Sequence, residues 1–147
     1  MDDEAEVAAV LAGFLRAVSF GPGGSPNYGA LRNMFSEGAR LIKNSAAVPE
    51  ISTVPEFIAS RHEQAATGRL TSFEETEVAD ITEVFGNIAH RLSTYDKRGI
   101  LDGVEFAARG VISTQFIRTP EGWRISAMAW DDERPGLTLP HRYQPGP

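Results

Sequence analysis

The second half of this chain constrains its fold more than any other feature. Four segments rich in Val, Ile, Thr, Phe and Tyr follow one another there with short interruptions, a composition that favours β-strands. They cover residues 71–85, 88–97, 104–118 and 123–131. Strands joined by short connections lie antiparallel to their neighbours. The sequence therefore predicts a meander of four long antiparallel strands.

The joints between these segments carry turn residues. Gly86-Asn87 marks a tight turn, and Lys97–Gly103 predicts a longer hairpin loop. The segment from Thr119 to Gly122 places Pro second and Gly fourth, as a type I turn prefers. Each joint is therefore expected to reverse the chain within the sheet.

The first half is predicted to be mainly helical. Apolar residues recur at steps of three and four through residues 3–19, which indicates a helix with one apolar stripe. Asp3 and Glu6 resemble a capping box at its start. The Gly- and Pro-rich stretch 20–26 ends the helix. It lacks the Lys-Ser/Thr ending of a phosphate-binding loop, so we interpret it as a linker.

Three further elements are expected before the strand meander: a short helix, a brief strand and a third helix. They cover residues 27–35, 38–43 and 54–67. Thr53 and Glu56 form a capping box for the third helix, Pro55 lies in its first turn, and Gly68 supplies its end. Helices followed by a strand meander predict an α+β fold with the helices on one face of the sheet.

Length and composition suit one domain. The chain has 147 residues, and we place the domain at residues 1–134. The tail, residues 135–147, contains four prolines and little apolar content, so we expect a surface arm there.

The charge and the absence of cysteine exclude several classes of function. A net charge of −6 argues against non-specific nucleic-acid binding, which depends on Lys and Arg. The chain contains no cysteine, which excludes disulfides, thiolate metal ligands and cysteine nucleophiles. The N-terminus is acidic where a secretory signal is basic, and no apolar run approaches the roughly 20 residues that span a bilayer. We therefore expect a cytoplasmic protein with neither a nucleic-acid nor a membrane partner.

The strand at 88–96 is mixed in character on both faces. One face carries Ala89, Arg91, Ser93 and Tyr95, whereas the other alternates His90 with Leu92, Thr94 and Asp96. A sheet with one solvated face alternates more cleanly between apolar and polar residues. We therefore predict that one face lines a cavity and that the other packs against a second subunit, as a homodimer through the sheet.

Two motifs carry a resemblance to a known family. Gly122-Trp123-Arg124-Ile125 opens the last strand, and Glu83–Ala89 (EVFGNIA) enters the second long strand. With the order of the preceding elements, they resemble the NTF2-like superfamily and its SnoaL-like members over about residues 3–132. The resemblance implies a cystatin-like cone, in which a curved antiparallel sheet wraps around N-terminal helices and an apolar cavity, and a dimer through the sheet. It implies no particular chemistry, because this fold hosts isomerases, cyclases, dehydratases, epoxide hydrolases and non-catalytic binding domains.

The catalytic sets of these enzymes match this sequence poorly. A ketosteroid isomerase places a carboxylate base on or just after the first strand, but residues 38–44 contain no acid. An epoxide-hydrolase set would combine Arg91 with Asp80 and with Asp131 or Asp132. The acidic run around Asp80, from Glu74 to Glu83, is however typical of a solvated strand face.

Candidate ligand-binding residues follow from strand alternation. Arg91 and Tyr95 share a face, and residues on the neighbouring strands join them if no β-bulge shifts the register. An inward-facing arginine needs a carboxylate, supplied by the protein or by a ligand. His62, one turn after Ile58, is predicted either to face the sheet or to lie on the helix flank. The candidates are Arg91, Tyr95, Trp130, His62, Thr114 and Met128.

We expect a protein that binds a small hydrophobic or carboxylate-bearing molecule in its cone, without a clear catalytic set. The alternative is a cofactor-independent isomerase, cyclase, dehydratase or epoxide hydrolase. An enzyme would carry an acid or base of perturbed pKa in the cavity. The three histidines are scattered without a ligand spacing, so we predict neither a metal nor a cofactor.

The two tryptophans, Trp123 and Trp130, bear on where the cavity wall lies. Seven residues separate them, which places them on opposite faces of a regular strand. We assign Trp123 to the core and Trp130 to the cavity wall, with Asp131 and Asp132 at the cavity mouth.

Overall fold

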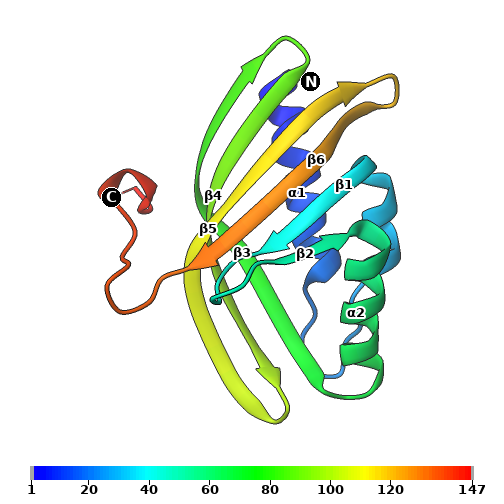
Figure 1. Cartoon of the computed structure of the whole chain (residues 1–147), viewed down its shortest axis with the longest axis vertical. Helices are drawn as coiled ribbons and strands as arrows, with labels where there is room; N and C mark the ends of the chain where they lie inside the picture. The colour runs from blue at the N-terminus through cyan, green and yellow to red at the C-terminus, as the bar shows by residue number, and fades with distance from the viewer. Residues whose placement is uncertain (1, 147) are drawn as a thin grey trace.

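The computed structural model, which describes residues 2–146, is a curved six-stranded sheet with two helices on one face (Figure 1). In chain order the elements are α1 (Asp3–Val18), the 3-10 helix η1 (Tyr28–Asn33), β1 (Phe35–Lys43), β2 (Glu50–Thr53), α2 (Val54–Ala66), β3 (Leu70–Phe85), β4 (Ile88–Leu101), β5 (Val104–Thr119), β6 (Gly122–Asp132) and the 3-10 helix η2 (His141–Tyr143). The α+β class and the order of helices before the strand meander are confirmed.

The strand order is β2-β1-β6-β5-β4-β3. Strands β3 to β6 form the predicted antiparallel meander. The sheet is mixed rather than antiparallel throughout, because β1 pairs with β6 in parallel. These two strands are far apart in the chain, so no short joint forces them to be antiparallel. Strand β2, which pairs with β1, was not predicted.

The predicted hairpin loop at 97–103 is a continuation of two strands. β4 runs to Leu101 and pairs it with Val104, so only Asp102 and Gly103 form the turn. Both turn residues have positive φ, of 52° and 77°. Asp-Gly is a preferred dipeptide for such a two-residue turn. Asp102-Gly103 therefore forms the turn alone, and the residues before it stay in β4.

The helix caps were predicted correctly for α2 and incorrectly for α1. Thr53 and Glu56 form the predicted reciprocal box, with hydrogen bonds of 2.8 and 3.2 Å. The cap of α1 is Asp2, whose carboxylate accepts a hydrogen bond of 2.7 Å from the Ala5 amide. Asp3 instead accepts from the Trp123 indole and pairs with Arg118. A tertiary contact to β5 and β6 thus takes the residue expected to be the cap.

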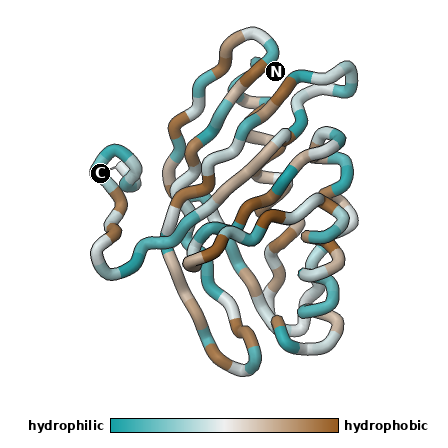
Figure 2. Tube along the Cα trace, in the orientation of Figure 1, coloured by the Kyte–Doolittle hydropathy of each residue, from teal (hydrophilic) through white to brown (hydrophobic). Residues whose placement is uncertain are grey.

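We call the side of the sheet that packs against α1 and α2 the inner face. The core lies there, between the apolar stripe of α1 and the central strands. Its largest fully buried side chains come from β4, β5, β6, β1, α1 and η1: Trp123, Tyr95, Phe116, Leu11, Leu31 and Leu41. Hydrophilic residues dominate the segment that leaves β6 towards the C-terminus (Figure 2).

Two β-bulges decide which side chains reach the inner face. In β3 the register shifts between Glu77 and Ala79, and in β6 it shifts between Ile125 and Ala127. Each shift reverses the alternation of side chains beyond it. The prediction that Trp123 and Trp130 lie on opposite faces was therefore wrong, because the second bulge brings both to the inner face.

The outer face carries the C-terminal arm. The Thr94 hydroxyl donates a hydrogen bond to the Tyr143 carbonyl, which places η2 against β4. The homodimer expected through the sheet remains a prediction. None of the helices within residues 2–146 combines the length and the apolar content that crossing a bilayer requires.

Gly110 is expected to be indispensable for packing. A Cβ there would overlap the Tyr95 hydroxyl and the Asp131 carbonyl oxygen. We predict that Gly110→Ala lowers the free energy of unfolding by about 3 kcal/mol, measured by urea denaturation. Gly21→Ala is the matched control, because the nearest atom to its Cβ, apart from its neighbours in the chain, would be a Glu74 carboxylate oxygen at 3.8 Å, which is an ordinary contact. Equal stability of the two variants would contradict the assigned packing.

Candidate functional site

A cavity of about 410 Å³ opens on the inner face between α2, the β1–β2 pair and the long β4–β5 hairpin. Aromatic and aliphatic side chains form much of its wall. They are Leu41, Phe57, Leu70, Phe73, Leu101, Phe106 and Trp130. The Phe57 and Trp130 rings meet edge to face, with centroids 6.3 Å apart. The cavity therefore presents an aromatic wall to any molecule that enters it.

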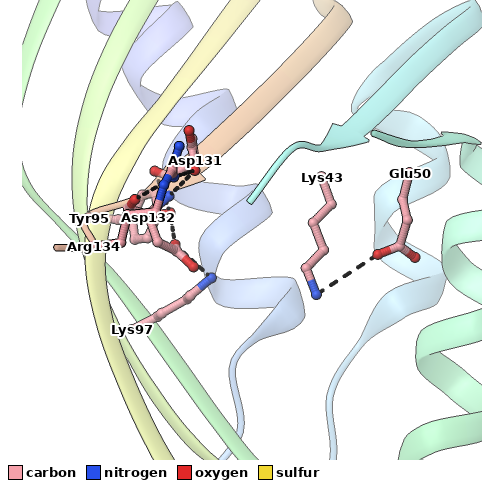
Figure 3. A network of polar contacts seen from close by, with 7 residues as sticks. All are labelled: Lys43, Glu50, Tyr95, Lys97, Asp131, Asp132 and Arg134. Carbon is pink, nitrogen blue, oxygen red and sulfur yellow. Dashed lines mark hydrogen bonds and ion pairs between the residues drawn. The ribbon is translucent and has the colours of Figure 1, made fainter. Parts of the chain in front are cut away.

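Two ion pairs border this cavity. Lys43 on β1 lies 4.0 Å from Glu50 on β2, and Lys97 on β4 lies 3.0 Å from Asp132 on β6. Figure 3 shows the two pairs, each formed between side chains of two different strands. The Lys43–Glu50 pair is exposed, whereas the Lys97 side chain is only 13% exposed. The Lys97–Asp132 pair is therefore the more constrained of the two.

The Asp132 carboxylate also accepts a hydrogen bond from the Tyr95 hydroxyl, which lies 3.0 Å from the Asp131 carbonyl oxygen (Figure 3). Burial and the charge of Asp132 raise the pKa of Tyr95 well above its ordinary value. Tyr95 therefore remains a protonated donor and holds Asp132 in place beside Lys97.

Glu75 on β3 is a further charged residue next to these pairs. It stands directly opposite Lys97 in the β3–β4 register. Both line a small inner pocket of about 20 Å³ with Arg61, Phe73 and side chains of α1. Burial raises the pKa of Glu75 to about 7, against the opposing charges of Lys97 and Arg61. A carboxyl group that exchanges its proton near neutral pH thus lies next to the cavity.

Arg61 on α2 lies between the cavity and the inner pocket. Its guanidinium carbon is 4.8 Å from the centroid of the Phe57 ring and 5.1 Å from that of Phe73. Desolvation lowers its pKa, and the neighbouring Tyr28 side chain and the charge of Glu75 oppose that effect. Within residues 2–146, no carboxylate forms a salt bridge with it inside 4.0 Å.

Five of the six predicted site residues lie on the inner face, but they do not form one site. Arg91, Thr114 and Met128 occupy one row across β4, β5 and β6. Thr114 and Met128 are buried, as is Tyr95. Trp130 alone among the six lines the main cavity. The prediction of a cavity-wall Trp130 is thus consistent with the structure.

The carboxylate that Arg91 needs comes from the protein. Its guanidinium binds Glu77 with distances of 2.6 and 3.0 Å and lies 3.0 Å from Asp80. Tyr95, which contacts Asp132, is four residues further along β4, or roughly 13 Å. Of the epoxide-hydrolase set, Arg91 and Asp80 lie together, but Asp131 pairs with Arg134 and Asp132 pairs with Lys97, so the full set is not assembled.

His62 is exposed and points away from the main cavity. It borders a shallow depression between α2 and the loop at 20–26. Of its two predicted placements, the helix flank is the observed one. Among residues 2–146 no group of three or more His, Asp or Glu side chains is positioned to hold a metal ion.

The sequence suggested that the acidic run of β3 forms one solvated face, but in the structure it is divided between the two faces of the sheet. Glu74 and Glu83 point outward and pair with Arg98 and His90. The residues that face inward are Glu75, Glu77 and Asp80, because the bulge near Val78 resets the alternation. The spacing from Phe73 to Glu75 and the pairing with Lys97 were the only signals that could have identified Glu75.

The raised pKa of Glu75 predicts a pH-dependent stability. The folded state holds this proton more tightly than the unfolded chain, whose carboxyl pKa is near 4.5. Its stabilising contribution is therefore complete below pH 4.5 and is lost as the pH rises to about 7. We expect Glu75→Gln to gain stability relative to the wild type across that range, by up to about 3 kcal/mol. A difference in free energy of unfolding between Glu75→Gln and the wild type that stays constant from pH 4.5 to 8 would contradict this prediction.

Comparison with known proteins bears on the fold. No protein-family model matches the sequence, and no curated protein matches it. An NTF2-like superfamily protein from Salmonella enterica serovar Typhimurium is similar in structure, with a TM-score of 0.72, 14% identity and coverage of 88% of this chain and 90% of that one.

Two further structures agree with it. An NTF2-like protein with a cystatin-like fold from Novosphingobium aromaticivorans has a TM-score of 0.67 and 16% identity, over 88% of this chain and 81% of that one. A candidate dehydratase of the NTF2-like family from Streptomyces avermitilis has a TM-score of 0.67 and 15% identity, over 89% and 96%. The three matches each cover 88% or 89% of this chain, so the chain has the NTF2-like, cystatin-like α+β fold.

Proposed function

We propose that this protein binds a small, largely apolar organic molecule in the cavity of its cone. The observation that carries the proposal is the cavity of about 410 Å³, whose wall combines aromatic side chains with a few charged groups. Ligand sites in proteins fall in this size range and have this mixture of apolar surface and convergent polar groups.

The aromatic wall supports this proposal. Phe57, Phe106 and Trp130 come from three different elements and line one space. Trp130 is only partly buried although it lies on the inner face, because it borders the cavity. Covering this surface with a ligand would remove apolar area from water, which is worth about 25 cal/mol per Å².

The two tryptophans provide an internal test. Trp130 borders the cavity, whereas Trp123 is 2% exposed and lies under Arg118. We predict that a ligand changes the fluorescence of Trp123→Phe, in which Trp130 is the remaining indole, and leaves that of Trp130→Phe nearly unchanged. Titration of both variants with aromatic fragments measures this. A response confined to Trp130→Phe would place the ligand elsewhere.

A second function, proton transfer on a bound substrate, is favoured by Glu75. A general base works best when its pKa lies near the working pH, and burial raises the pKa of Glu75 to about 7. Lys97 and the Tyr95–Asp132 pair add positive charge and hydrogen-bonding groups next to it. An isomerase, cyclase or dehydratase needs such a combination. The Streptomyces avermitilis protein of the same fold is a candidate dehydratase, which agrees with this alternative.

Deuterium exchange tests the catalytic alternative without a known substrate. A base in the cavity would exchange the acidic C–H protons of small ketones and enones in D₂O. We expect the exchange rate, measured by proton NMR, to fall at least 100-fold in Glu75→Gln. Glu74→Gln, which removes an outward-facing carboxylate from the adjacent position, should retain the wild-type rate. If the wild type exchanges the C–H protons of none of these compounds faster than buffer alone does, the catalytic alternative is contradicted and only the binding function is retained.

A further inference from the structure

The charged groups around the cavity do not all pair with one another. Lys43 pairs with Glu50, and Lys97 pairs with Asp132. Arg61 and Glu75 remain, and their charged groups are not within 4.0 Å of each other. Because Glu75 is partly protonated near pH 7, the cavity holds a cation that no protein carboxylate neutralises fully.

The surroundings of the half-buried Arg61 differ from those of Arg91, the buried arginine on β4. Arg91 binds Glu77 through two hydrogen bonds and lies beside Asp80. Arg61 has instead two aromatic rings, those of Phe57 and Phe73, within 5.1 Å of its guanidinium carbon. The nearby Tyr28 hydroxyl is buried without a hydrogen-bond partner, and it is neutral because burial raises its pKa, so it does not offset the charge of Arg61. A desolvated guanidinium without a carboxylate is costly unless something else satisfies it.

We infer that Arg61 is the anion seat of the cavity, and that the ligand is a small organic acid whose carboxylate binds Arg61 while its apolar body packs against Phe57 and Trp130. This inference rests on the proposed binding function and specifies its ligand class. Arginine presents a planar fork that matches a carboxylate with two parallel hydrogen bonds. The two rings that flank Arg61 hold its side chain on the cavity wall, and they supply apolar surface next to the charge.

Binding of an anion to Arg61 is coupled to protonation of Glu75. Glu75 is faced by Lys97 from β4, by Arg61 from α2 and by Asp132 from β6. A bound carboxylate offsets the two cations and adds a negative charge near Glu75, so it raises the pKa of that carboxyl group further. The complex therefore takes up a proton, and affinity for the anion falls as the pH rises through 7 and above.

Matched acid and amide probes test the inference. We expect 2-naphthoate to bind at least tenfold more tightly than 2-naphthamide at pH 6.5, measured by isothermal titration calorimetry. In Arg61→Gln the two affinities should become equal, with that of the amide unchanged. Arg61→Lys keeps the charge without the fork and should retain part of the preference. Arg98→Gln removes an exposed cation outside the cavity and should behave as the wild type.

The outcomes separate this inference from the proposed function. If the amide binds as tightly as the acid in the wild type, the cavity binds small molecules but Arg61 is not an anion seat. If neither probe nor other aryl acids and amides bind at millimolar concentration, both proposals fail. The coupling between anion binding at Arg61 and proton uptake is also overturned if the affinity for 2-naphthoate stays constant or increases from pH 6 to 8.5 and no proton is taken up.

Discussion

Two single-residue bulges determine the chemistry of the inner face. Without the bulge near Val78, Glu77 and Asp80 would point to opposite faces, and Arg91 would lose one of its two carboxylates. Without the bulge near Ser126, Trp130 and Asp132 would face outward, and Lys97 would lose its ion-pair partner. A register change of one residue moves every following side chain to the other face. The cavity wall and the buried ion pairs therefore depend on backbone irregularities more than on any single contact.

The inner face carries two arginines in different electrostatic situations. Arg91 pairs with Glu77 and Asp80 and donates a hydrogen bond to Thr82, so it has a structural role. Arg61 lies at the cavity, where aromatic rings take the place of carboxylates. Burying a charge costs several kcal/mol unless partners compensate it. Arginine thus forms a closed structural ion pair on β4, whereas on α2 it would be available to bind an anionic ligand.

The sequence predicted the elements better than the site. Strand-forming composition, the Thr53 cap and the turn at Thr119–Gly122 depend on local chemistry, and the structure agrees with them. The site depends on long-range register. Strict alternation placed Arg91 and Tyr95 on one face of β4, as in the structure, but it could not reveal that Glu77 and Asp80 would reach Arg91. Neither bulge has a glycine or proline at its centre, so the sequence offered no local signal for them.

Binding and catalysis would use the same residues in this cavity. The access of a ligand to Glu75 distinguishes the two functions. The inner pocket of about 20 Å³ has room for roughly one water molecule. A ligand held on Arg61 would therefore meet Glu75 through its narrowest end or through one bridging water. In the first case Glu75 acts directly on the ligand as a base. In the second it mainly adjusts the charge of the site to the bound anion. The position of a carboxylate bound to Arg61 would thus also determine whether Glu75 can reach a carbon-bound proton of the ligand.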